Sequence, residues 1–117
     1  MPIETKQTAL KIARILQDKK ALDVLVLDIS SLTAIADYFI IASGRSESQV
    51  RALYEEVEEK MKEQGLEVKR RDGQQGNRWI AMDYGDVIIH LFHHEEREFY
   101  SLERLWAGGV PLSVDNT

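Results

Sequence analysis

Most of the residues that could do chemistry lie in one stretch of this sequence, RWIAMDYGDVIIHLFHHEE, from Arg78 to Glu96. The stretch holds all three histidines of the chain, which raise the question of a metal site. It also holds two aspartates three positions apart, which raise the question of an active site. A tryptophan and a tyrosine accompany them, and these residue types are enriched where proteins bind other macromolecules.

The histidine spacing does not favour a metal site. Zinc requires three or four converging ligands. On an extended strand His90 and His93 point to opposite faces, and the adjacent side chains of His93 and His94 diverge. Neither HExxH nor HxxEH occurs, and the absence of cysteine excludes thiolate ligands, thiolate catalysis and disulfides. We therefore predict no metal site and no cofactor.

The aspartates do not fit an active site either. A two-metal phosphoryl-transfer site needs carboxylates on one face of a strand, which calls for Asp-x-Asp spacing. Asp83 and Asp86 are three apart with Gly85 between them, and aspartate is common in turns, where its side chain bonds to nearby backbone. We interpret the pair as turn residues.

A second, weaker signal lies in IASGRSES, from Ile41 to Ser48. A strand, a glycine and a helix start resemble an anion site, but no GxGxxG or GxxxxGK[ST] motif is present. Ser43 also lacks the GxSxG context of a nucleophile. A strand-to-helix turn with a helix cap is the favoured interpretation, so we predict no catalytic residues and no enzyme.

The aromatic residues remain as the best candidates for a functional surface. In an extended strand Trp79, Ala81 and Asp83 share one face, and the aliphatic Ile80 and Met82 share the other. The aliphatic pair is the better candidate for the core, which leaves Trp79 half exposed beside a small residue and an acid. That is the composition of an interaction hot spot, although Trp79 could equally cover the edge of the core.

Hydrophobic periodicity predicts three helices and five strands. Helices are expected over 5–20, 46–64 and 95–106, and strands over 23–29, 38–43, 66–71, 79–83 and 86–92. The long helix begins with a capping box formed by Ser46 and Gln49, and Gly65 is placed to end it in a left-handed conformation. Tyr84-Gly85 marks a hairpin turn between the last two strands.

These elements suit a single α/β domain over 1–106, bordering on α+β, with helices packed on a mixed five-stranded sheet. The strands at 38–43 and 66–71 flank one helix, so we expect them to be parallel neighbours joined by a right-handed crossover. Residues 107–117 contain glycines, a proline and little to bury, and we expect a frayed, flexible C-terminal tail.

Charge and hydropathy restrict the partners. The formal net charge is −5, which disfavours primary nucleic-acid binding and favours a basic protein partner. No run reaches the roughly 18 apolar residues that span a membrane, and the first residues do not resemble a secretory signal. A cytoplasmic protein is the simplest expectation.

The order of elements and four segments resemble the ribosomal silencing factor family, also called Iojap-like proteins. The segments are DVLVLDI, SLTAIADYFIIASGRSESQV, RWIAMDYGDVIIHLF and EEREFYSLERLW, which together cover most of residues 5–106. The resemblance implies a nucleotidyltransferase-like topology without enzymatic activity, often as a homodimer. It also implies binding to the large ribosomal subunit through its ribosomal protein number fourteen. Bound there, the family blocks joining of the small subunit and represses translation when nutrients are limiting.

The resemblance also implies where the partner binds, on the hairpin and the last helix. The matching positions in this sequence are Trp79, Asp83, Asp86, His90, Tyr100, Leu102 and Trp106, and Tyr84 joins the expected contact set from a turn position that varies in the family. Two other classes of function remain open from the sequence. These are a small nucleotidyltransferase-like enzyme, which would bind nucleotide with Mg²⁺, and a dimerisation module, which would self-associate without binding ribosomes.

Overall fold

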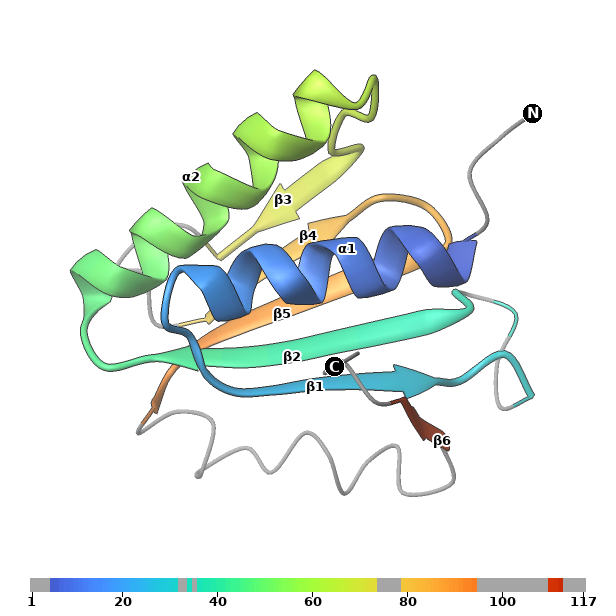
Figure 1. The fold of residues 1–117 in the computed structure, drawn as a ribbon, viewed down its shortest axis with the longest axis horizontal. Helices are drawn as coiled ribbons and strands as arrows, with labels where there is room; N and C mark the ends of the chain where they lie inside the picture. Colours follow the sequence, from blue (N-terminus) through green and yellow to red (C-terminus); the bar gives the residue numbers. More distant parts are fainter. Residues whose placement is uncertain (1–4, 32–33, 35, 74–78, 95–109, 113–117) are drawn as a thin grey trace.

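The computed structural model describes residues 5–31, 34, 36–73, 79–94 and 110–112. These residues form two helices and six strands in one compact arrangement (Figure 1). In chain order they are α1 (Thr5–Asp18), β1 (Leu22–Asp28), β2 (Tyr38–Gly44), α2 (Glu47–Glu63), β3 (Arg70–Asp72), β4 (Trp79–Asp83), β5 (Val87–His93) and β6 (Val110–Leu112). The helix expected over 95–106 lies outside the described residues.

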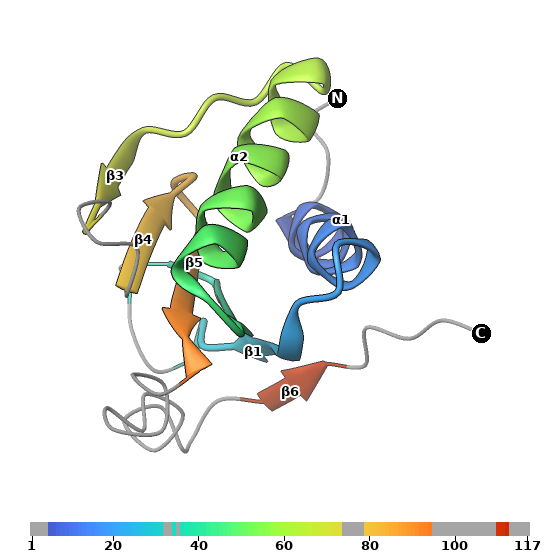
Figure 2. The same ribbon diagram turned by 90° about the vertical axis from the view of Figure 1, so that its left-hand side faces the viewer.

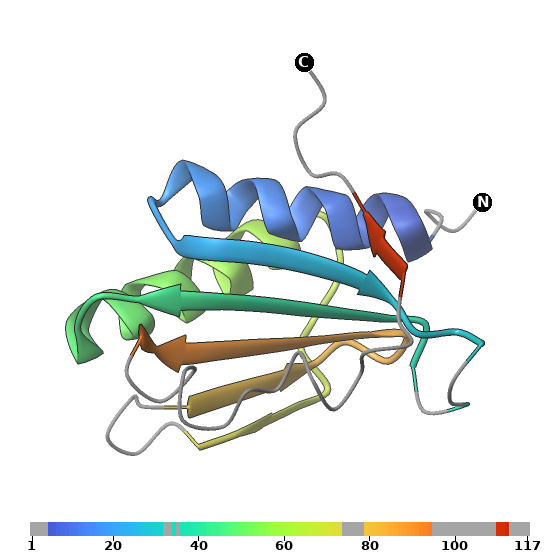
Figure 3. The ribbon, with the colours of Figure 1, turned by 90° about the horizontal axis from the view of Figure 1, so that it is seen from below.

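The strands form one mixed sheet in the order β3-β4-β5-β2-β1-β6. The β2–β5 pair is parallel and every other pair is antiparallel. Both helices cover the same face of this sheet, as Figure 2 shows, and Figure 3 views the molecule from the other face. The predicted α/β class with a mixed sheet is confirmed, and all five expected strands are present.

Two features of the sheet differ from the expectation. Residues Val110–Leu112 pair with β1 as β6, where a frayed tail was expected. The strand after α2 is shorter than expected, and it is not the neighbour of β2, because β4 and β5 lie between them. The polarity of the strands explains this order. All three residues of β3 are exposed, which suits a sheet edge, whereas β5 is buried along most of its length and takes the interior place beside β2.

The sheet carries apolar side chains on both faces, so the molecule has two hydrophobic clusters. The main cluster joins both helices to the sheet and includes Ile40, Ile80, Met82, Ile89 and Leu91. The smaller cluster on the opposite face consists of Leu27, Ile29, Ala36, Phe39, Ile41 and Phe92, with Trp79 packed against it. Alternate residues of the central strands therefore belong to different clusters, as expected for strands that are covered on both faces.

The start of α2 has the predicted Ser46 cap, but the second bond of the predicted capping box is displaced. The Gln49 amide N–H donates to the Ser46 hydroxyl at 3.1 Å, whereas the Gln49 side-chain oxygen accepts from the Arg45 amide, one residue before the expected position. A Cβ added to Gly44 would lie 3.0 Å from the Val50 side chain and backbone nitrogen. Close packing of strand against helix therefore explains this glycine, in agreement with a strand-to-helix turn and cap. At the other end, Gly65 has φ +85°, the predicted left-handed cap.

Replacing Ser46 with alanine should lower the free energy of unfolding by about 1 kcal/mol, because the Gln49 amide loses its acceptor. Urea denaturation would measure this change. Ser48→Ala is the matched control, since Ser48 is exposed in the first turn of the same helix and its replacement should be nearly neutral. Equal losses in the two variants would contradict the capping role of Ser46.

Candidate interaction surface

The register of β3, β4 and β5 brings several predicted residues together on the face of the sheet opposite α1 and α2. Trp79 lies opposite Phe92, and Ala81 lies between Asp72 on β3 and His90 on β5. Directly paired residues project to the same face of a sheet. We call this group, extended by Asp83 at the end of β4, the Trp79 surface.

Contacts with His90 and Phe92 hold Trp79 in place. Its indole N–H donates to Nδ1 of His90 at 3.1 Å, and its ring stacks on Phe92 with centroids 5.0 Å apart. The expected division of β4 is confirmed, because Ile80 and Met82 are fully buried on the helix side while Trp79 is partly buried on the other side. The indole is more enclosed than the expected half exposure, since it also packs against the smaller cluster.

His90 supports the indole from β5. Its ring also meets Phe39 edge-on at 5.0 Å, and burial among these rings lowers its pKa to about 4. The imidazole is therefore neutral at pH 7. Because Nδ1 accepts the indole hydrogen bond, the imidazole proton lies on Nε2. His90 thus acts as an acceptor that sets the orientation of Trp79.

The other two histidines do not join His90. Strand alternation sends His93 to the face opposite His90, as expected. The rings of His93 and His94 do not diverge, however, but stack with centroids 4.7 Å apart. The expected divergence fails because β5 ends at His93, so strand alternation no longer applies to His94. Within the part of the chain that the structure describes, no three His, Asp or Glu side chains are placed to hold a metal ion.

Asp83 and Asp86 occupy the β4–β5 turn, as predicted. The Gly85 amide donates to Asp83 Oδ1 at 2.6 Å, and Gly85 has φ +95°. The backbone carbonyl of Asp86 accepts from the amides of Asp37 and Tyr38, at 2.8 and 3.1 Å, which ties the turn to the start of β2. Asp83 is partly buried beside the Trp79 surface, and Asp86 is exposed at the end of the hairpin.

Tyr84 does not share this surface, contrary to the expectation that it would lie with Trp79. Its ring packs against the main cluster on the helix side of the sheet. The strand period explains the difference, since residue 84 continues the alternation of Ile80 and Met82. Burial raises the Tyr84 pKa to about 12, and the nearby Glu58 carboxylate adds to the shift. Its hydroxyl is buried without a hydrogen-bond partner among the described residues.

Tyr84→Phe should therefore leave the free energy of unfolding unchanged or raise it by up to about 1 kcal/mol, because the hydroxyl is buried at a cost that no bond offsets. Urea denaturation would measure the change. Tyr84→Ala, which also removes the ring, should be clearly destabilising. A loss of more than about 1 kcal/mol in Tyr84→Phe would show that the hydroxyl bonds to something within the fold.

Tyr100, Leu102 and Trp106, the remaining predicted contact residues, lie outside the described residues, as do Glu95 and Glu96. The structure adds two residues that the sequence did not single out. Phe92 stacks under Trp79, and Asp72 lies across from Ala81. Asp72, Gly73, Trp79 and Ala81 line an open hollow of about 290 Å³. Only the pairing of β3 with β4 could have identified Asp72, because it is seven residues from Trp79.

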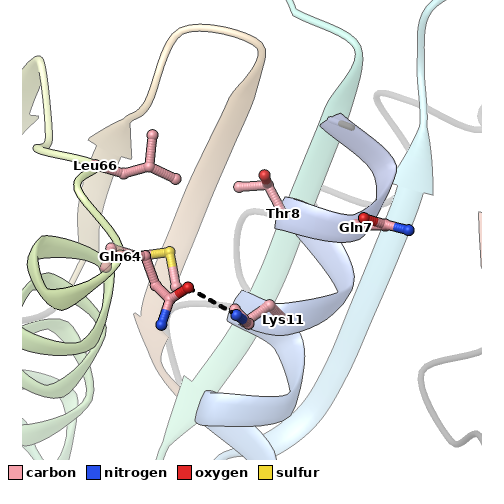
Figure 4. A pocket seen from close by; sticks show the side chains of 6 residues that line it. Gln7, Thr8, Lys11, Gln64 and Leu66 are labelled. Carbon is pink, nitrogen blue, oxygen red and sulfur yellow. Dashed lines mark hydrogen bonds between the residues drawn. The ribbon is translucent and has the colours of Figure 1, made fainter. Parts of the chain in front are cut away.

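A second hollow, of about 160 Å³, lies between the two helices on the opposite side of the sheet (Figure 4). Its walls include Met61, Leu66 and Thr8, and the Lys11 ammonium donates to the Gln64 side-chain oxygen at 2.9 Å across it. This bond links α1 to the end of α2.

Neither of these two helices has the length and apolar character needed to cross a membrane.

Comparison with known proteins gives concordant matches. The model of the family described as "Ribosomal silencing factor during starvation" matches residues 2–116. The ribosomal silencing factor of Bacillus subtilis is 44% identical over 96 residues, which cover 82% of this chain and 80% of that protein. A mouse relative named "Mitochondrial assembly of ribosomal large subunit protein 1" is 30% identical, over 79% of this chain and 42% of that protein. The crystal structure of a Chromobacterium violaceum protein superimposes with a TM-score of 0.87 at 33% identity, covering 98% of this chain and 95% of that one.

Proposed function

This chain is a member of the ribosomal silencing factor family, and from that premise we propose that it represses translation by binding the large ribosomal subunit. The partner on that subunit is its ribosomal protein number fourteen. Bound on the joining face, the domain keeps the small subunit away when nutrients are limiting. The name of the mouse relative, which refers to assembly of the large subunit, supports the choice of subunit.

The observation that carries the proposal is the fixed indole on the face of the sheet opposite α1 and α2. A ring already oriented by His90 and Phe92 loses little conformational freedom on binding, which favours it as an anchor. Asp83 and Asp86 lie on the same hairpin, and a chain of net charge −5 attracts a basic ribosomal protein. Tyr100, Leu102 and Trp106 complete the proposed contact set, and Tyr84 does not belong to it.

Repression by this route requires no chemistry. The folded chain measures 37 × 33 × 31 Å, and a body of this size on the joining face excludes the other subunit by its volume. The name of the family describes a regulatory role, which fits a protein without enzymatic activity. Affinity for one subunit is then sufficient for function.

Sedimentation through sucrose gradients with separated ribosomal subunits tests the proposal. We expect the protein to travel with the large subunit alone, and to do so less at high salt because part of the attraction is electrostatic. Small subunits added afterwards should not join the loaded particles. Failure to sediment with the large subunit would refute binding, and joined ribosomes that retain the protein would refute steric blocking.

Homodimer formation is part of the same proposal and is tested separately. Light scattering during gel filtration gives the mass of the protein alone. A dimer that dissociates when large subunits are added would place the self-association and docking surfaces in competition. A stable dimer that never sediments with ribosomal subunits would instead support a dimerisation module.

A further inference from the structure

The hollow beside Trp79 has mainly apolar walls. Trp79 and Ala81 supply an aromatic ring and a methyl group, and Gly73 supplies bare backbone. Gly73 has φ +81°, and a Cβ there would lie 2.0 Å from the Trp79 carbonyl oxygen, so only glycine fits at this position. Among the described residues that line it, the charged group is the Asp72 carboxylate. The hollow is therefore an apolar recess with an acid at its margin.

Size and polarity restrict what can enter. At about 290 Å³ the hollow is at or below the lower limit of small-molecule pockets, roughly 300–1,000 Å³, so it suits a single side chain better than a cofactor. The indole N–H is committed to His90, which leaves the Asp72 carboxylate, an acceptor, as the polar wall group. A carboxylate at the margin attracts a cation, which an apolar occupant would not supply. A side chain with an alkyl stem and a cationic end satisfies both parts of the wall.

The present partner of Asp72 is consistent with such an occupant. Arg70 Nε lies 3.1 Å from Asp72 Oδ2, with 74% and 61% of the two side chains exposed. An ion pair this exposed contributes little to stability, so the carboxylate can exchange one cation for another with little loss. Arg70 also demonstrates that a guanidinium can approach Asp72 on this face of the sheet.

We propose that the hollow receives a lysine or arginine side chain of the docking partner, with its stem along Trp79 and Ala81 and its charge at Asp72. The inference rests on the proposed function and specifies the partner's chemistry at that same surface. Asp72 then selects a basic partner. Trp79 and Ala81 pack along the alkyl stem of the partner's side chain and so favour a long one. Contact between a cation and an indole adds to the attraction.

Two substitutions test this arrangement against purified large ribosomal subunits. Asp72→Asn should weaken binding about fivefold at about 0.05 M salt and much less at about 0.5 M salt, where screening has already weakened this attraction in the unmodified protein. Ala81→Leu fills the hollow and should weaken binding more than tenfold at both salt concentrations. The double variant should bind no more weakly than Ala81→Leu, because an expelled side chain no longer reaches Asp72.

Matched controls lie on the other side of the molecule. Asp18→Asn makes the same charge change at the exposed end of α1, and Ala52→Leu makes the same volume change on the exposed face of α2. Both should bind as the unmodified protein does. Thermal unfolding of each variant verifies that it is folded, and Asp72→Asn, at an exposed edge position, is expected to fold in any case.

The outcomes separate the inference from the function on which it rests. Normal binding by Ala81→Leu would overturn the occupied hollow and leave the proposed function standing. Normal binding by Asp72→Asn together with weak binding by Ala81→Leu would show an apolar occupant and overturn the cationic one. Absence of binding by the unmodified protein would overturn both.

Discussion

Replacing Trp79 with alanine is expected to weaken binding to the large ribosomal subunit at least thirtyfold. Loss of a central aromatic anchor typically costs about 2 kcal/mol or more, and each 1.4 kcal/mol is about a factor of ten. The effect is large because the indole is already oriented by His90 and Phe92 before the partner arrives. Titration of labelled protein with purified large subunits would give the affinity.

The same substitution also lowers stability, so folding must be measured alongside binding. The variant loses the stacking on Phe92 and the bond to His90, and we expect it to unfold about 2 kcal/mol more easily. Trp79→Phe should retain much of the stacking, lose the hydrogen bond and bind with intermediate affinity. A folded Trp79→Ala variant that binds large subunits as tightly as the unmodified protein would remove the anchor from the proposal.

Tyr54→Ala provides the matched control for loss of an aromatic ring. Tyr54 is partly buried and packs against the main cluster from α2, on the opposite side of the sheet from Trp79. Its removal should therefore lower stability without changing affinity for the large subunit. Weak binding by both variants would mean that stability, and not the Trp79 surface, controls the interaction.

The second large effect is expected from acidification, through His90. Its pKa is about 4 in the folded protein against an ordinary value of 6.5, because burial disfavours the imidazolium. Above pH 6.5 the imidazole is neutral in both the folded and unfolded states, and the histidine does not alter stability. As the pH falls below 6.5 the unfolded chain takes up the proton first, so stability is lost progressively until about pH 4.

The size of this loss follows from the pKa difference at about 1.4 kcal/mol per unit. It amounts to about 2 kcal/mol at pH 5 and about 3 kcal/mol at pH 4 and below. His90→Gln is the informative variant, since glutamine can still accept the indole hydrogen bond but does not titrate. Urea denaturation of both proteins between pH 7.5 and pH 4 should show that the unmodified protein loses this extra stability and His90→Gln does not. An equal loss of unfolding free energy in the two proteins would contradict the role of His90.

Local features of the fold could be predicted because they depend on neighbouring residues. The buried stripe of α1, the Ser46 cap of α2 and the Asp83–Gly85 turn each follow from side chains a few positions apart. The separation of Trp79 from Ile80 and Met82 follows from the strand period alone. The same period would have placed Tyr84 on the helix side, had the alternation been continued one residue into the turn.

The order of the strands in the sheet was the main error of the sequence-based prediction, although the sequence contained part of the information needed to predict it. The flanking of one helix by 38–43 and 66–71 was interpreted as pairing, whereas β2 pairs with β5. Both β2 and β5 are apolar on both faces, as interior parallel strands must be, and the arginine-rich β3 is suited to an edge. The three-residue strand in the tail, β6, had no comparable signal in a segment with so little to bury.

The sequence by itself determined the class of the fold, its family, and the face of β4 on which Trp79 lies, because periodicity and turns are encoded over a few residues. Only the tertiary structure decided which strands are neighbours, and with them the bond between Trp79 and His90 and the placing of Asp72 beside Ala81. These contacts join residues from separate strands. Their positions depend on a register set by the packing of the whole sheet, which no local pattern contains.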